Sequence, residues 1–415
     1  MAYTEKETTG YGTRVGRSFK GILTGIILFI GGTVLLWWNE GRAVRTADML
    51  EEAQKACEVM ENPSKKNAAL DGELVCGTAM ATTEDSLVDK DFGIGATAIS
   101  LKRDVEYFQW VESRHEETED KLGGKEEKTI TYTYDKKWVD SPISSSDFKE
   151  SGHTNFTLTT VEPDQQWAEN VTFGAYMLNE SLIRSMTAAE PLELNLSDEL
   201  LSQLNKNTQE AYERFNGKTA VLPSDSGYNY IHVTDNQLYL GLNAAAPQVG
   251  DVRITFEKVM PAKVTVVSVV DGDTFKPFKA SNGEHFQKLV MGKKSIDEIF
   301  DGEKSVNTIL TWLLRLLGTL LVIGGLKGVF GFIEAILKVV PFLANIVGWG
   351  VGLVCTIVGI VWSLIVIAIA WLFYRPVLGI TLLVIAGLLV WIFAFGGKNK
   401  IKQLANKKKD EPAQA

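Results

Sequence analysis

The chain has 415 residues, of which 45% are hydrophobic and 22% are charged. This balance excludes both a disordered chain and a protein buried wholly in a membrane. The formal net charge of −9 argues against nucleic acid as a partner. Residues 40–307 carry 28 Lys and Arg against 46 Asp and Glu, a net −18, whereas the two ends carry 14 basic and 5 acidic residues, a net +9. An acidic middle between basic, apolar ends indicates a membrane protein with a large water-soluble domain.

The first candidate span is an uncharged apolar run at residues 21–38. A helix of that length extends about 27 Å, close to the roughly 30 Å of a hydrocarbon core. A cleaved signal peptide is the alternative, but the run is long for one and lacks a small-residue cleavage site. Trp37 and Trp38 end the run, as interfacial anchors do. We therefore predict transmembrane helix 1 at 21–38, after a cytoplasmic N-terminal segment at 1–20.

The acidic middle, residues 39–307, predicts a domain that mixes helices and strands. Helical patterns occur at 43–60, 175–186, 197–204 and 295–309, and strand patterns at 73–80, 236–242, 251–257, 263–270 and 274–278. The clearest strands, 98–111 and 128–138, form a predicted hairpin whose charged tip, 112–127, is expected to be a solvated loop. The fold class is therefore an α+β extracytoplasmic domain inserted between one N-terminal and three C-terminal transmembrane helices of an integral membrane protein.

The C-terminal third contains the other three predicted spans. They are transmembrane helix 2 at 308–325, helix 3 at 346–372 and helix 4 at 377–395. Between helices 2 and 3, residues 326–345 place Lys327, Glu334 and Lys338 on one helical face, which predicts an amphipathic connection lying in the interface. Pro376 makes a tight hairpin turn between helices 3 and 4. A basic tail follows at 396–415.

Basic residues near the spans predict the orientation of the chain. They gather in three segments: the N-terminal flank (Lys6, Arg14, Arg17, Lys20), the connection (Lys327, Lys338) and the tail (Lys398, Lys400, Lys402, Lys407, Lys408, Lys409). With four spans, all three segments lie on one side, which is then the cytoplasm. The domain at 39–307 faces an organelle lumen or the periplasm, and the basic flanks are expected to contact anionic lipid headgroups.

Arg315 is the one charged residue within the second predicted span. An arginine there is costly and raises a functional hypothesis, so we expect Arg315 and Glu334 to form an intramembrane polar site. The alternative is structural, either an ion pair with Glu334 or a lipid phosphate, or a side chain that reaches the interface. Trp371 and Arg375, beside the last turn, are expected to anchor the helices at the membrane surface.

The cysteines allow one disulfide in the outer domain. Cys57 and Cys76 are its only cysteines, and Cys355 lies inside a predicted span. In an oxidising compartment the first two can bridge, closing a loop of about 20 residues worth roughly 3 kcal/mol. Two free thiols remain the alternative.

No sequence pattern indicates catalysis or a bound metal. The four histidines, His115, His153, His232 and His285, are far apart, and the chain has no paired-histidine or CxxC motif. Nucleophile-elbow, Walker A and dinucleotide-binding motifs are also missing. We therefore expect neither an enzyme nor a cofactor.

Several strings resemble the transmembrane protein 43 (LUMA) family. They are Asn39-Glu40-Gly41-Arg42-Ala43 after the first span, 103–112, the strand at 132–138 with Gly152-His153, 250–253, and the turn at 371–376. Their order and spacing cover nearly the whole chain. The resemblance implies a four-span endomembrane protein with a large lumenal domain, found in animals in the inner nuclear membrane and endoplasmic reticulum. It also implies self-association and the organisation of proteins such as emerin and lamins, whereas a bacterial member would lie in the inner membrane.

Two functions compete on this evidence. The first is a multi-pass membrane scaffold that forms homo-oligomers and organises other membrane proteins. The second is an intramembrane enzyme or lipid-handling protein that uses Arg315 and Glu334. The resemblance and the missing catalytic motifs favour the scaffold.

Overall fold

The computed structural model describes residues 2–121, 125–215, 229–337, 341–377, 379–381 and 384. The chain divides into two compact units. The β unit comprises residues 1–9, 49–119 and 126–302, and the helical unit comprises residues 10–48, 120–125 and 303–415.

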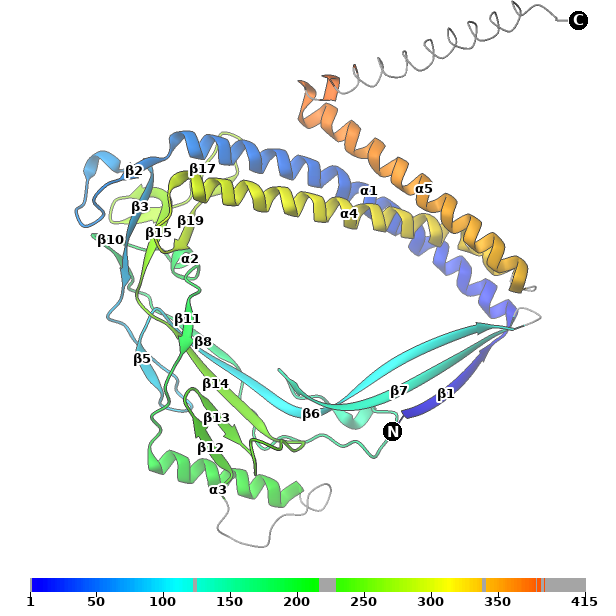
Figure 1. Ribbon diagram of the computed structural model, residues 1–415, viewed down its shortest axis with the longest axis horizontal. Helices are drawn as coiled ribbons and strands as arrows, with labels where there is room; N and C mark the ends of the chain where they lie inside the picture. Colours follow the sequence, from blue (N-terminus) through cyan, green and yellow to red (C-terminus); the bar gives the residue numbers. More distant parts are fainter. Residues whose placement is uncertain are drawn as a thin grey trace, which may run out of the picture. The chain divides into compact units, whose positions relative to one another are not determined.

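Three long helices supply the helical unit: α1 (Tyr11–Ala56), α4 (Ile296–Leu337) and α5 (Pro341–Tyr374), drawn in blue, yellow and orange in Figure 1. By length and composition, each contains a segment able to cross a membrane, namely Lys20–Ala56, Ile296–Ile333 and Gly348–Tyr374. One N-terminal and two C-terminal candidate spans are therefore present. The fourth predicted span, 377–395, lies almost entirely outside the described residues, and the tail at 396–415 lies wholly outside them.

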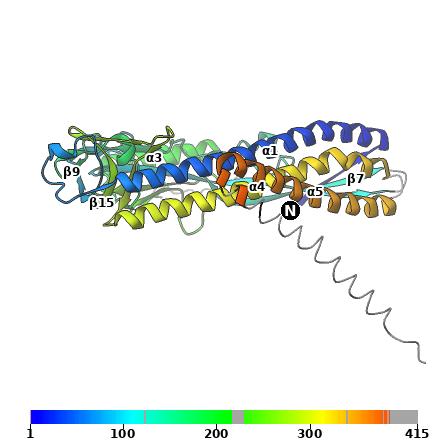
Figure 2. The ribbon, with the colours of Figure 1, turned by 90° about the horizontal axis from the view of Figure 1, so that it is seen from above.

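Glycines allow α1 and α4 to approach closely, and the two helices lie side by side in Figures 1 and 2. A Cβ at Gly25 would lie 2.6 Å from the backbone nitrogen of Val329 and 2.7 Å from the carbonyl oxygen of Gly325. A Cβ at Gly325 would lie 2.5 Å from the nitrogen of Phe29. Small residues at such positions let two helix backbones pack together in a membrane.

Helix α5 packs on α1 through Trp362, whose indole nitrogen donates a hydrogen bond to the Thr33 hydroxyl at 3.0 Å. Its ring centroid lies 5.4 Å from that of Phe29. The mid-helix tryptophan therefore holds two candidate spans together.

The predicted amphipathic connection at 326–345 differs in the structure. Its first part continues α4 to Leu337, and α5 begins at Pro341. Pro341 occupies the first position of a helix, where its missing N–H costs nothing. Of the three charges that suggested a separate interfacial helix, Lys327 and Glu334 belong to the end of this long apolar helix, and Lys338 lies outside the described residues.

The β unit contains an eight-stranded sheet with the order β1-β7-β6-β14-β13-β12. Its strands are β1 (Ala2–Thr9), β7 (Glu126–Val139), β6 (Ser100–Asp120), β14 (Val252–Val259), β13 (Gln237–Leu240) and β12 (Ile231–Thr234). Two short strands also pair with it: β11 (Ala189–Pro191) with β14, and β8 (Asp164–Trp167) with β6. Tyr212 of helix α3 (Asp198–Phe215) belongs to the hydrophobic cluster of this sheet, with Leu238 and Phe256.

A second, seven-stranded sheet follows the order β10-β9-β3-β15-β16. Its strands are β10 (Tyr176–Met177), β9 (Thr172–Phe173), β3 (Leu74–Thr82), β15 (Ala262–Asp271) and β16 (Thr274–Lys276), with β2 (Glu58–Met60) beside β3 and β19 (Lys288–Met291) beside β15. Phe173, Tyr176 and Met186 fill its core. The smaller elements are the pairs β4 (Ser86–Val88) with β5 (Gly95–Thr97) and β17 (Phe278–Lys279) with β18 (His285–Phe286), helix α2 (Glu180–Ile183), and 3₁₀ turns at Ala68–Leu70 and Ser145–Asp147.

The N-terminal segment differs from its prediction as a cytoplasmic flank. Residues 2–9 form β1, which pairs antiparallel with β7 from Ala2 opposite Thr133 to Thr9 opposite Glu126. In the structure residues 2–9 are therefore part of the β unit. That 1–20 and 39–307 lie on opposite sides of a membrane stays a prediction, and the pairing of β1 with β7 is the observation against it.

The predicted hairpin tip at 112–127 is mostly strand. β6 continues to Asp120 and β7 starts at Glu126, so the charged residues extend a two-stranded ribbon. The predicted helix at 175–186 is also wrong, because β10 takes its start and only Glu180–Ile183 is helical. The predicted helix at 43–60 belongs to α1 as far as Ala56 and then gives way to β2.

Candidate functional site

Arg315 forms a buried ion pair with Glu40, not with Glu334. Its Nε and Nη2 atoms donate to the two carboxylate oxygens of Glu40 at 2.6 and 2.8 Å. The side chain of Glu40 is 3% exposed and that of Arg315 is 16% exposed. Glu334 lies in α4, but its side chain falls outside the described part of the structure. The ion pair joins α1 to α4.

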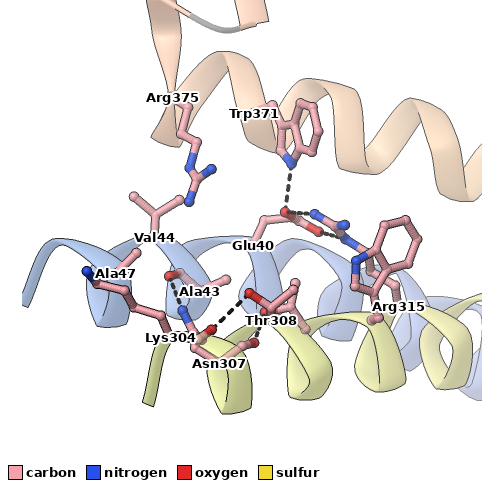
Figure 3. Close-up of a pocket in the computed structure, with 12 residues that line it drawn as sticks. Glu40, Ala43, Val44, Ala47, Lys304, Asn307, Thr308, Arg315, Trp371 and Arg375 are labelled. Atoms are coloured by element: carbon pink, nitrogen blue, oxygen red, sulfur yellow. Dashed lines mark hydrogen bonds and ion pairs between the residues drawn. The ribbon is translucent and has the colours of Figure 1, made fainter. Parts of the chain in front are cut away.

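Trp371 brings the third helix into the same cluster. Its indole Nε1–H donates to Glu40 Oε2 at 2.7 Å, so the carboxylate accepts hydrogen bonds from both α4 and α5 (Figure 3). The guanidinium carbon of Arg315 lies 5.5 Å from the Trp371 ring centroid and 4.8 Å from that of Trp312. The faces of the two tryptophan rings therefore stabilise the positive charge of Arg315. We call Glu40, Arg315 and Trp371 the three-helix clamp.

A second set of polar contacts lies beside the clamp and joins α1 to α4 again. The Asn39 amide, fully buried, donates to the Thr311 carbonyl at 3.0 Å. Arg42 donates to the Asn307 amide oxygen at 3.0 Å and to the Thr311 hydroxyl at 2.9 Å. Asn307 in turn donates to the Ala43 carbonyl at 3.0 Å. These contacts provide hydrogen bonds to most of the buried polar groups, and Nε of Arg42 has no partner among the described residues.

Gly41 lies between these charged residues and contacts α5. A Cβ at this position would lie 2.6 Å from the Tyr374 ring. Trp37, one turn earlier, has its ring centroid 5.7 Å from Phe373 and 5.8 Å from Tyr374. The string Asn39-Glu40-Gly41-Arg42 therefore has a structural role. The side chains of Asn39, Glu40 and Arg42 form hydrogen bonds or ion pairs with α4. Gly41 has no side chain and so leaves space for Tyr374 of α5.

A cavity of about 280 Å³ opens next to the clamp. It lies between α1, α4 and α5 and is lined by Glu40, Ala43, Val44, Ala47, Lys304, Asn307, Thr308, Thr311, Trp312, Arg315, Trp371 and Arg375 (Figure 3). The lining combines three cations with a single carboxylate. Glu40 already accepts hydrogen bonds from Arg315 and Trp371, whereas the side chain of Arg375 has no such partner among the described residues.

The predicted interface anchors have different environments. Trp38 is half exposed, at 49%, as an interfacial anchor would be. Trp37 packs on α5, and Trp371 belongs to the clamp, so each also joins helices. Arg375 lines the cavity, and its side chain makes no hydrogen bond or ion pair with a residue that the structure describes.

Sequence reasoning found Arg315 and missed its partner. Glu40 directly follows the uncharged run at 21–38, and Asn39 and Arg42 flank it. The signal was present, because these residues form one of the strings that carry the family resemblance. Their role as partners of Arg315 depends on how α1 and α4 pack, which periodicity alone does not determine.

Cys57 and Cys76 lie together in the β unit as free thiols. Val59, two residues after Cys57, is opposite Cys76 in the parallel pairing of β2 with β3. A hydrogen bond between the two side chains and burial raise the pKa of Cys57, and the same bond lowers the pKa of Cys76. The two thiols are neighbours, as the predicted bridge requires.

The β unit contains a buried carboxylate of its own at Asp251, which is 0% exposed. It accepts hydrogen bonds from the hydroxyls of Tyr212 and Tyr239 and from the backbone of Gln248. Burial raises the pKa of Asp251 even though these bonds act in the opposite direction. Burial, together with Asp251, raises the pKa of both tyrosines, which therefore remain donors. This cluster joins α3, β13 and the start of β14.

Asp89 and Arg103 form a second buried ion pair in the β unit. Arg103 donates to both carboxylate oxygens of Asp89, at 2.8 and 2.7 Å, and to the Glu162 carbonyl at 3.0 Å. The side chain of Arg103 is 6% exposed and that of Asp89 is 3% exposed. Asp251 and Arg103 lie in family-like strings, and both clusters hold separate segments together, which is a structural use of charge. Among the residues that the structure describes, no group of three His, Cys, Asp or Glu could hold a metal ion.

Comparison with known proteins identifies the family. Residues 107–376 match the family Transmembrane protein 43. The chain is 28% identical over 385 residues to Transmembrane protein 43 of Homo sapiens, covering 91% of this chain and 90% of the relative. It is 27% identical over 387 residues to the protein of that name in Rattus norvegicus (90% and 89% covered) and 28% identical over 374 residues to the Drosophila melanogaster homolog (87% and 90% covered). No solved structure matches the chain. Because the match covers well over half of the sequence, the chain belongs to the transmembrane protein 43 family.

Proposed function

We propose that this protein is a multi-pass membrane scaffold that self-associates and organises other membrane proteins. The observation that carries the proposal is the three-helix clamp. Arg315 is the charged residue in a candidate span that raised a catalytic hypothesis, and both oxygens of Glu40 bind it. A charge held in this way fixes the arrangement of three helices, which is a structural use of an arginine in a span.

The outer surfaces of the helical unit are consistent with this role. Large apolar side chains are exposed along α5, among them Trp349, Ile357 and Val361, at 73%, 54% and 49%. In a membrane such faces are covered by lipid or by other helices. A fixed bundle presents these faces in a constant geometry, which is what a scaffold needs in order to bind partners.

The compartment belongs to the same proposal. An endomembrane, including the inner nuclear membrane, is the expected location in a eukaryote, and the inner membrane in a bacterium. The acidic composition of 39–307 supports a domain in water beside that membrane. The basic tail, which carries the expected contacts with anionic lipid, lies outside the described residues.

Self-association is tested by crosslinking two differently tagged copies in native membranes before solubilisation. We expect crosslinked species at multiples of the 45.8 kDa monomer, with both tags in one species. The crosslinked fraction should persist when expression is reduced tenfold, because a specific interface does not depend on crowding. Monomers alone at both expression levels would rule out the scaffold.

The alternative, an intramembrane enzyme or lipid-handling protein using Arg315 and Glu334, makes the opposite prediction for Arg315→Leu. If Arg315 acts chemically, this variant assembles normally and loses a lipid-dependent activity. If Arg315 serves the clamp, the variant destabilises the bundle, because Glu40 then stays buried without its partner.

A further inference from the structure

The cavity beside the three-helix clamp has the composition of an anion site. Its lining residues include Lys304, Arg315 and Arg375 against Glu40, a formal net charge of +2. Glu40 is committed to Arg315 and Trp371. Figure 3 shows the guanidinium of Arg375 pointing from α5 toward α1. A guanidinium and an ammonium at one cavity are the groups that bind phosphate in proteins.

The position of the cavity distinguishes a lipid phosphate from a soluble one. Trp37, Trp38 and Trp371 lie around the end of the uncharged run at 21–38, where a hydrocarbon core gives way to headgroups. The volume, about 280 Å³, is small for a complete ligand pocket and suits a headgroup alone. The remainder of such a ligand would lie outside the cavity.

An apolar track leads away from the cavity along α4. Trp312 lines the cavity and is 64% exposed, and Leu316 and Leu320 follow at 58% and 56% exposed. Residues four apart lie on one face of a helix, so these side chains form a continuous exposed stripe. The stripe extends into the apolar segment of α4, as acyl chains must when the headgroup occupies the cavity.

We propose that the cavity binds the phosphate of an anionic phospholipid, with Arg375 and Lys304 as the charged contacts and the acyl chains along Trp312, Leu316 and Leu320. Bound lipid then adds an anion where α1, α4 and α5 meet. The inference goes beyond the scaffold function and does not depend on it. It also assigns Arg375 a specific site, in place of a general contact with the membrane surface.

The test uses the full-length protein, delipidated in detergent, and native mass spectrometry. The probes are phosphatidylglycerol and phosphatidylcholine with identical acyl chains. We expect the wild type to retain phosphatidylglycerol preferentially, and Arg375→Gln with Lys304→Gln to weaken that binding about tenfold, because each basic residue near a membrane contributes to anion binding. The matched control, Lys65→Gln with Lys279→Gln, removes two exposed cations of the β unit and should bind as the wild type does.

Two further variants keep the test decisive if the double variant is unstable. Ala47→Leu places a larger side chain in the cavity without changing charge and should abolish the preference. Arg375→Lys retains the positive charge and should preserve the preference for phosphatidylglycerol. Equal binding of the two lipids by the wild type, or equal losses in the cavity and control variants, would overturn the proposal. Stabilisation by inorganic phosphate without a preference for phosphatidylglycerol would show that the ligand is a soluble phosphate, and would overturn the assignment to lipid.

Discussion

Glu40 shows what one residue contributes to this architecture. A carboxylate that is 3% exposed next to an apolar span is costly unless its oxygens are bound. Here Arg315 and Trp371 supply the donors, and each comes from a different helix. The charge therefore specifies which helices meet and in what register. The net contribution of such a pair to stability is modest, whereas loss of one partner costs about 3–5 kcal/mol.

Asp251 is the residue for which a pH dependence is expected. Burial raises its pKa in the folded protein, so the folded state keeps its proton up to a higher pH than the unfolded state does. The stability that this proton provides is complete below the unfolded pKa of about 3.9 and is lost as the pH rises through the raised folded pKa. Asp251→Asn does not titrate, so the stability of the wild type relative to this variant should fall over that window.

Thermal unfolding of both proteins across acidic and neutral pH measures this difference. As the pH rises, the Tm of the wild type should fall relative to the Tm of Asp251→Asn. A gap that is constant with pH, or one that moves the other way, would show that Asp251 is not protonated more readily in the folded state.

Among the elements, β1 has the largest consequence for topology. It pairs with β7 along eight residues, and Lys6 forms an ion pair with Glu127 at 2.8 Å. The strand is therefore part of the β unit, and the pairing predicts that both lie on one side of the membrane. The positive-inside rule predicts the opposite side for residues 1–20, because it counts basic residues and takes no account of strand pairing.

Cysteine labelling checks the placement of β1. In a variant that lacks the three native cysteines, Glu7→Cys and Lys65→Cys put single exposed thiols on β1 and on the β unit. In sealed vesicles, a membrane-impermeant maleimide should label both from the same side. Labelling of Glu7→Cys and Lys65→Cys from opposite sides would contradict the pairing of β1 with β7.

Elements with a strong local pattern were predictable from the sequence. The strand patterns at 73–80, 251–257 and 263–270 became β3, β14 and β15, and Gly272, at φ +60°, lies in the turn between β15 and β16. The helical pattern at 197–204 became the longer α3. The ribbon at 112–127 was not predictable, because its charged residues look like a loop until a partner strand pairs with them.

On the scale of the whole molecule, the distribution of charge and hydropathy identified a membrane protein with a large polar domain and three of its candidate spans. It also singled out Arg315. The partner remained hidden, because 275 residues separate Glu40 from Arg315. Sequence proximity favoured Glu334, whereas the close glycine-mediated packing of α1 on α4 brings Glu40 to Arg315. Contacts of this range depend on tertiary packing, which periodicity does not encode.

The central claim is that Glu40 and Arg315 act as one unit to hold the helices together, and a double-mutant cycle tests it most directly. Unfolding of Glu40→Gln, Arg315→Gln and the double variant is measured by denaturant titration in mixed micelles, with the exposed pair Glu51 and Lys55 of the same helix as the control. Each single change should lower the free energy of unfolding by about 3 kcal/mol, since it leaves a buried charge unpaired. The double variant should lose about as much as one single change, and the control pair should couple by less than about 0.5 kcal/mol. If the two losses simply add, Glu40 and Arg315 do not form a clamp.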